Sequence, residues 1–113
     1  MTTTRRISDL ISIVNDEQDV EERVYRLAEY VKQDYNKYGY NSSFNVEIKK
    51  GRKYYKVITE NSVHCFVDVK NGDVYKAASW NKPAKHVRFN LLTNPQDCYN
   101  KVTWSGGYLY LRW

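Results

Sequence analysis

The fold is decided by residues 62–79, SVHCFVDVKNGDVYKAAS, which place the pair Asn71-Gly72 between two runs of strand-forming residues. Asn and Gly both tolerate a positive φ, so this pair predicts a two-residue β-hairpin in which Val69 lies opposite Val74. Successive side chains of a strand point to opposite faces of a sheet. One face would hold Val67, Val69 and Val74, and the other would hold His64, Phe66, Asp68, Tyr75 and Ala77.

The sequence before this hairpin predicts two more strands. Apolar and polar residues alternate over residues 44–49, and a second strand follows over residues 52–59 after a short turn. Together with the strands on either side of Asn71-Gly72, they form an antiparallel meander of four strands. The face of the second strand opposite Tyr55 and Val57 would carry Tyr54, Lys56 and Ile58.

The sequence after residue 79 loses the strand pattern. Residues 80–86 contain Pro83 and predict a loop, and residues 87–92 predict a short strand. Asn94-Pro95 is typical of a helix N-cap followed by the first helical residue, so a short helix is expected over residues 95–101. Residues 108–113 alternate again and predict a last strand.

The N-terminal part of the chain predicts helices. The apolar residues Ile7, Leu10, Ile11 and Val14 mark a first helix over residues 4–14, and Asn15-Asp16 interrupts it. A second helix would then run to residue 37 and pack on the sheet, although its apolar stripe could also form an oligomer seam. That stripe consists of Val20, Val24, Leu27, Ala28, Val31 and Tyr35.

These elements predict a single α+β domain over residues 1–113, helical over 4–37 and β-rich over 43–113. The β-rich part would form a strongly bent antiparallel sheet or a small barrel, with a short helix before the last strand, and an Sm-like barrel is one candidate. With 113 residues the chain can build one hydrophobic core. It has no apolar run long enough for a bilayer and no signal-peptide pattern, so we expect a soluble intracellular protein.

The charge is unevenly distributed along the chain. Residues 1–37 hold six Lys/Arg and eight Asp/Glu, a net charge of −2, whereas residues 38–113 hold twelve and five, a net charge of +7. Fourteen of the seventeen aromatic residues also lie from Tyr38 onward. A segment that is both basic and aromatic can contact phosphates and stack on bases. The alternative is a charge that serves solubility, with Tyr used as a strand former.

Two basic groups are the candidate nucleic-acid-binding residues. The first lies at the tip of a predicted hairpin, and the second lies in and around the loop of residues 80–88, where Trp80 either packs on the core or stacks on a base. RNA or another single strand is the favoured partner, since single strands expose their bases. The predicted site comprises Lys49, Lys50, Arg52, Lys53, Lys76, Trp80, Lys82, Lys85, His86 and Arg88.

Catalysis has weaker support in the sequence. His64 and His86 have the right chemistry for the acid and base of a metal-independent ribonuclease, but nothing in the sequence brings them together. Cys65 and Cys98 show no paired-cysteine motif, so reduced thiols are expected. A single disulfide between them is the alternative. Because neighbouring strand residues point to opposite faces, a zinc site that uses both His64 and Cys65 is disfavoured. No metal or cofactor is predicted.

Residues 63–92 together with the closing WSGGYLYLRW resemble a group of small proteins from tailed phages, especially those known from marine samples. The shared pattern comprises residues 72–74, 76–78, 83–85 and 88–90. The resemblance implies a phage origin, residence in the bacterial host cytoplasm and, more loosely, an Sm-like fold.

The sequence therefore favours a non-enzymatic phage accessory protein that binds nucleic acid, with no membrane partner. The main alternative is a protein-interaction module, such as a virion component or an inhibitor of a host factor, because Tyr, Trp and Arg are abundant at interfaces. A homo-oligomer is also possible.

Overall fold

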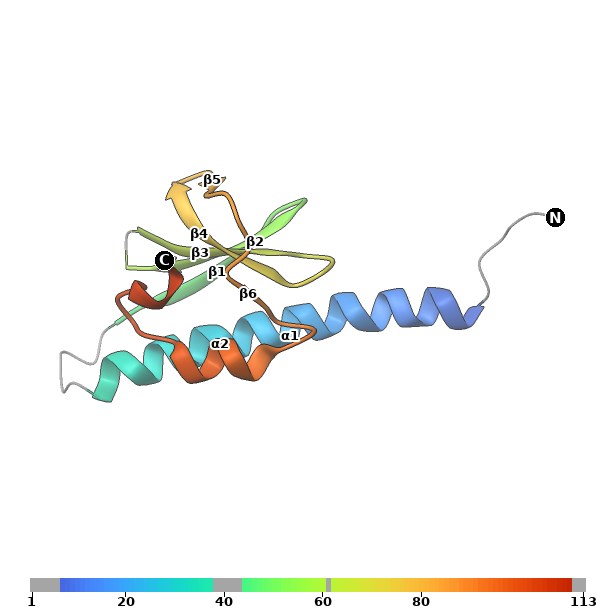
Figure 1. Ribbon diagram of the computed structural model, residues 1–113, viewed down its shortest axis with the longest axis horizontal. Coiled ribbons are helices and arrows are strands. Elements are labelled where there is room, and N and C mark those ends of the chain that lie inside the picture. Colours follow the sequence, from blue (N-terminus) through green and yellow to red (C-terminus); the bar gives the residue numbers. More distant parts are fainter. Residues whose placement is uncertain (1–6, 38–43, 61, 111–113) are drawn as a thin grey trace.

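The computed structural model describes residues 7–37, 44–60 and 62–110 of the chain. One long helix, α1 (Ile7–Lys37), precedes a curled antiparallel sheet, and a short helix, α2 (Pro95–Lys101), lies beside α1 (Figure 1). The predicted α+β class is therefore confirmed. Within the described residues, no helix is long and apolar enough to span a membrane.

The N-terminal part forms one helix and not two. The predicted interruption at Asn15-Asp16 is wrong, because both residues lie inside the continuous α1. Neither is Gly or Pro, and Asn or Asp within a helix costs only about 0.7 kcal/mol relative to Ala. The predicted apolar stripe is buried from residue 20 to residue 31, with Val20, Val24, Leu27, Ala28 and Val31 in the core, and it ends with the partly exposed Tyr35.

The sheet begins with the predicted meander of four strands. These strands pair antiparallel in sequence order, and they are β1 (Val46–Lys50), β2 (Tyr54–Thr59), β3 (Ser62–Asp68) and β4 (Asp73–Ser79).

Two short strands then return to the free edge of β4. Strand β5 (Lys82–Pro83) pairs with its second half, and β6 (Phe89–Asn90) pairs with its first half. In the described part of the chain β1 and β5 each have one neighbour, so the sheet is bent but not closed into a barrel.

The hairpin between β3 and β4 has a longer loop than predicted. Val74 lies opposite Val67 and not opposite Val69, which leaves a loop of residues 69–72. Asp68 Oδ1 accepts hydrogen bonds from the backbone N–H groups of Lys70 (2.8 Å) and Asn71 (3.1 Å), and this local turn replaces the tight one. Only Gly72 adopts a positive φ, 77°, whereas a two-residue turn of Asn-Gly needs two such residues.

The core lies between the concave face of the sheet and the two helices. Strands β2 to β4 supply Tyr55, Val57, Cys65, Val67 and Val74, and these side chains pack with the apolar stripe of α1. Later segments complete the core with Leu91, Cys98, Tyr99 and Leu109. Both cysteines are buried and free, in agreement with the expected reduced thiols.

The C-terminal part confirms one prediction and corrects another. Helix α2 has the predicted bounds, and the Asn94 side chain accepts a hydrogen bond from the backbone of Asp97. The strand predicted over residues 108–113 is wrong where the structure describes it, because Gly107–Leu109 form a 3₁₀ helix, η1. Gly106 precedes it with a φ of 82°, and this left-handed turn directs Leu109 into the core. Residues 111–113 lie outside the described part.

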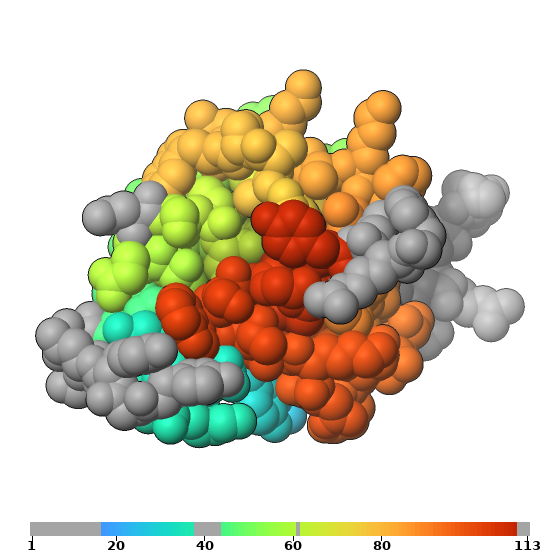
Figure 2. All heavy atoms as spheres, turned by 60° about the vertical axis from the view of Figure 1, so that its left-hand side comes forward, coloured from blue at the N-terminus to red at the C-terminus, as the bar shows by residue number. Residues whose placement is uncertain are grey.

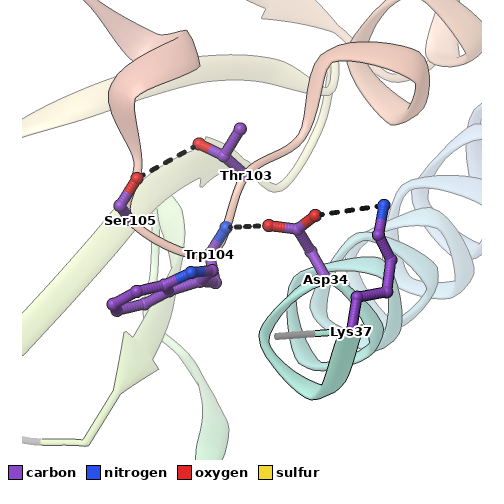
Figure 3. Close-up of polar contacts among 5 residues, drawn as sticks. All are labelled: Asp34, Lys37, Thr103, Trp104 and Ser105. Atoms are coloured by element: carbon purple, nitrogen blue, oxygen red, sulfur yellow. Dashed lines mark hydrogen bonds and ion pairs between the residues drawn. The ribbon is translucent and has the colours of Figure 1, made fainter. Parts of the chain in front are cut away.

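The end of α1 is tied to the segment before η1 through one carboxylate. Asp34 Oδ2 accepts a hydrogen bond of 2.9 Å from the backbone N–H of Trp104, and Asp34 Oδ1 lies 3.5 Å from Lys37 Nζ (Figure 3). The Trp104 ring packs edge-on against Tyr35, with 5.1 Å between ring centres. Contacts so far apart in the sequence fix the C-terminal segment on the helix.

We expect Asp34→Ala to lower the free energy of unfolding by about 1–3 kcal/mol, because a partly buried donor loses a charged acceptor. Asp34→Asn keeps an oxygen and should lose less. Lys37→Ala removes only the exposed ion pair, so a change below about 1 kcal/mol is expected. Urea unfolding of the three variants measures these values, and equal losses in Asp34→Ala and Lys37→Ala would assign the effect to the ion pair.

Candidate nucleic-acid interface

The face of the sheet that points away from α1 carries a row of basic and aromatic side chains. The strand register places Lys49 opposite Lys56, Lys56 opposite Phe66, and Phe66 opposite Tyr75. Residues directly opposite in neighbouring strands lie on the same face. The row therefore crosses β1 to β4, and we call it, together with Tyr54 and Trp80, the outer sheet face.

The aromatic part of the outer sheet face is well packed. The Tyr54 ring meets Phe66 and Tyr75 edge-on, at 5.8 and 5.9 Å between ring centres. Phe66 is only 3% exposed, because its neighbours cover it. Lys53 Nζ lies 5.4 Å from the centre of the Tyr54 ring. Tyr54 and Tyr75 stay partly exposed, so the sheet holds two accessible rings in fixed positions.

Lys56 connects this face with the turn after β4. Its ammonium lies 4.9 Å from the centre of the Trp80 ring and donates a hydrogen bond of 3.0 Å to Asn81 Oδ1. The Trp80 side chain is 46% exposed, so it is not a core anchor. A groove of about 270 Å³ runs beside Lys56, and it is lined by Lys49, Lys50, Gly51, Arg52, Lys53, Tyr54, Lys56, Phe66 and Asn81.

Part of the predicted site is brought together here. Residues Lys49, Lys50, Arg52 and Lys53 all line the groove, and Trp80 joins them through Lys56. Sequence reasoning missed Tyr54, Lys56, Phe66, Tyr75 and Asn81 as members of the same surface. The alternation of residues already placed Tyr54 with Lys56, and Phe66 with Tyr75. The missing information was which residues of neighbouring strands lie opposite each other.

Arg88 lies elsewhere, and its guanidinium is used within the chain. It donates hydrogen bonds to the backbone carbonyls of Lys85, His86 and Leu109, the last at 2.8 Å from Nε. The loop before it is also held along β4, since Ala84 N bonds to Lys76 O and Arg88 N bonds to Val74 O. These bonds anchor the loop to the sheet. The side chains of Lys82, Lys85 and His86 are exposed on it.

Lys76 is also separated from the groove. Its ammonium lies 4.6 Å from the centre of the Tyr110 ring, and it lines a second cavity together with His64. The predicted basic residues therefore divide among the groove, the anchored loop and this cavity.

The two histidines have different environments. His64 is buried, and its Nε2 lies 2.7 Å from the Tyr108 hydroxyl, whereas His86 is exposed in the anchored loop with a φ of 71°. Burial lowers the pKa of His64 from 6.5 to about 4. The described residues show no contact between the two rings, and they contain no cluster that could hold a metal ion. The geometry thus gives no support to an acid–base pair.

The low pKa of His64 makes stability depend on pH. Between pH 4 and 6.5 the unfolded chain binds a proton at this residue that the folded protein does not, so stability falls as pH falls through this range. From pH 7.5 to 5 we expect a loss of about 2 kcal/mol from His64. Urea unfolding of the wild type and His64→Gln at both pH values measures it.

His86→Gln is the matched control for this measurement, because it removes an exposed imidazole. It should lose the same stability on acidification as the wild type, whereas His64→Gln should lose about 2 kcal/mol less. Identical pH profiles for the wild type and His64→Gln would contradict a neutral buried His64.

One comparison with known proteins gives a result. The model of a protein family described as "Family of unknown function (DUF7717)" matches residues 9–111. No curated protein and no solved structure matches the chain. The match covers α1 from residue 9 onward, the whole sheet and α2, so the outer sheet face lies within the family's domain.

Proposed function

Because the chain belongs to the DUF7717 family of unknown function, we propose its function from the chemistry of its side chains. It binds single-stranded nucleic acid, with RNA as the favoured ligand, through the outer sheet face. The single observation that carries this proposal is the row Lys49, Lys56, Phe66 and Tyr75, with the exposed Trp80 ring held beside Lys56. Proteins that bind single strands combine a cationic groove with aromatic rings.

The cations would hold the phosphates. The residues Lys49, Lys50, Arg52, Lys53 and Lys56 lie around one groove. Each contact with a phosphate releases counterions, so binding should weaken steeply as salt rises.

The aromatic rings would hold the bases. Trp80 is the most exposed ring of the face, at 46%, and Tyr54 and Tyr75 are partly exposed beside it. Stacking of one base on one ring contributes about 1–3 kcal/mol and does not depend on the base. A duplex keeps its bases stacked inside the helix, so this surface favours single strands.

Fluorescence anisotropy of labelled single-stranded RNA, single-stranded DNA and duplex RNA tests the proposal across several salt concentrations. We expect the single strands to bind more tightly than the duplex, with a slope of log K against log salt near −2 or steeper if three or more phosphates are contacted. Undetectable binding, or binding that does not respond to salt, would refute the proposal.

A role in protein binding is the second candidate, and the solvent face of α1 favours it. Tyr25 and Tyr30 are 57% and 37% exposed, and Tyr25 lines a shallow acidic depression with Glu21, Glu22, Arg26 and Glu29. Exposed tyrosines are common at protein interfaces. Copurification of one stoichiometric protein that resists nuclease treatment, and is lost in Tyr25→Ala, would support this role.

Phage origin and residence in a bacterial cytoplasm are proposals that rest on the resemblance of residues 63–92 to tailed-phage proteins. In that setting a small basic domain would meet phage or host transcripts, which fits RNA as the first partner.

A further inference from the structure

A second cavity lies apart from the groove, between residues 104–110 and parts of β2, β3 and β4. It has a volume of about 430 Å³, within the range of about 300–1,000 Å³ that is typical of small-molecule sites. Residues 104–106, 109 and 110 line it, and Figure 2 shows this C-terminal part of the described chain, in red, beside the yellow-green and yellow parts of the sheet. The cavity and the groove share no lining residue.

Two buried polar side chains line this cavity with unused hydrogen-bonding atoms. Thr59 is 8% exposed and His64 is 7% exposed. Among the residues that the structure describes, no hydrogen bond is made by Thr59 Oγ1 or by His64 Nδ1, while His64 Nε2 contacts Tyr108. The described residues contain no buried side-chain nitrogen or oxygen atom that lacks a hydrogen-bond partner, so these two unpaired atoms are reached from the cavity and can bond to a ligand with matching polar atoms.

Gly106 keeps the free edge of the His64 ring accessible. A Cβ atom at this position would lie 3.8 Å from His64 Cε1 and 3.9 Å from Nδ1, in contact with that edge. The pKa of His64, about 4, keeps the ring neutral at pH 7. A neutral imidazole offers one donor or one acceptor at Nδ1, and a hydroxyl offers both. Thr59 and His64 together can therefore bind the polar edge of a neutral heterocycle.

The walls and the mouth of the cavity are different in character. Phe44, Trp104 and Tyr110 provide aromatic surface, and Lys76 holds its ammonium 4.6 Å from the centre of the Tyr110 ring. Tyr110 is 60% exposed, which places Lys76 at the mouth. Glu60 also lines the cavity, but its carboxylate accepts a hydrogen bond from Asn45 N. An anionic group of the ligand therefore fits beside Lys76 and not beside Glu60.

We propose that this cavity binds a nucleoside 5′-monophosphate. The base lies between the aromatic walls with its polar edge on Thr59 and His64, and the phosphate lies at Lys76. The site goes beyond the binding of single strands, because it would take a free mononucleotide in a cavity that shares no lining residue with the groove.

Isothermal titration calorimetry with AMP, GMP, CMP and UMP tests the proposal, with adenosine and ribose 5-phosphate as partial ligands. We expect at least one monophosphate to bind with a Kd below about 1 mM and ribose 5-phosphate not to bind. Binding of none of the four, or equal binding of ribose 5-phosphate, would overturn the proposal.

Thr59→Val keeps the shape of the side chain and removes the hydroxyl, so binding should weaken about fivefold or more. Thr93→Val makes the same change at an exposed position and should leave the Kd unchanged. If AMP binds, it should bind more tightly than adenosine, because its phosphate lies at Lys76. Lys76→Met removes this cation and should abolish the difference in affinity. Unchanged binding in both Thr59→Val and Lys76→Met rejects the site, and Lys76→Met decides alone if Thr59→Val does not fold.

The variant Lys49→Glu/Lys56→Glu separates this site from the groove. It alters only the outer sheet face, so it should bind mononucleotides as the wild type does. Loss of mononucleotide binding in that variant would place the nucleotide in the groove and overturn the cavity site, whatever the result for single-stranded RNA.

Discussion

The double variant Lys49→Glu/Lys56→Glu is expected to bind single-stranded RNA on the order of 100-fold more weakly than the wild type at low salt. Lys49 and Lys56 are opposite each other on β1 and β2 and both line the groove. The substitutions remove two cations and place two anions where phosphates would lie. The salt slope should also become shallower by about 1.4, since each phosphate contact contributes about 0.7 for a single strand.

Arg26→Glu/Lys32→Glu is the control, because it makes the same change in net charge on the exposed side of α1. If the overall charge alone attracts RNA, both double variants should lose the same affinity. A specific site on the sheet predicts a large loss only in the first variant. Anisotropy titrations at two salt concentrations, with circular dichroism to verify folding, distinguish these outcomes.

Trp80→Ala tests the aromatic half of the same site. Loss of one stacked base should weaken single-strand binding by about 1–3 kcal/mol and leave the salt slope unchanged, because no cation is removed. The Lys56 ammonium loses its partner ring in this variant, but it keeps the hydrogen bond to Asn81. Tyr25→Ala, which removes an exposed ring on α1, is the matched control and should bind RNA normally.

Short-range signals in the sequence predicted the elements well. The strand alternation, the apolar stripe of α1 and the Asn94-Pro95 helix start each depend on neighbouring residues, and each is confirmed. The two errors had different causes. The loop of residues 69–72 has a local cause, because the side chain of Asp68 accepts hydrogen bonds from Lys70 and Asn71. Residues 107–109 form a 3₁₀ helix where a distant part of the chain decides, because Leu109 enters the core.

The residues of the candidate site also divide into those that could be predicted from their neighbours in the sequence and those that depend on distant contacts. The tip residues Lys49, Lys50, Arg52 and Lys53 are close in sequence, and so their grouping could be predicted. The contact between Lys56 and Trp80 joins residues that are far apart, and it depends on the register of three strands. Arg88 looked equally suitable as a cation, yet its bonds to backbone carbonyls depend on the path of the loop.

Leu27→Ala is expected to lower the free energy of unfolding by about 2–5 kcal/mol, the range for removing a buried leucine. Leu27 is fully buried in the core cluster, where it joins α1 to the sheet. Tyr25→Ala deletes a larger side chain from the same helix, but that residue is 57% exposed, so a change within about 0.5 kcal/mol is expected. Urea unfolding gives both values. Similar small losses in the two variants would mean that the buried stripe of α1 does not hold the helix against the sheet.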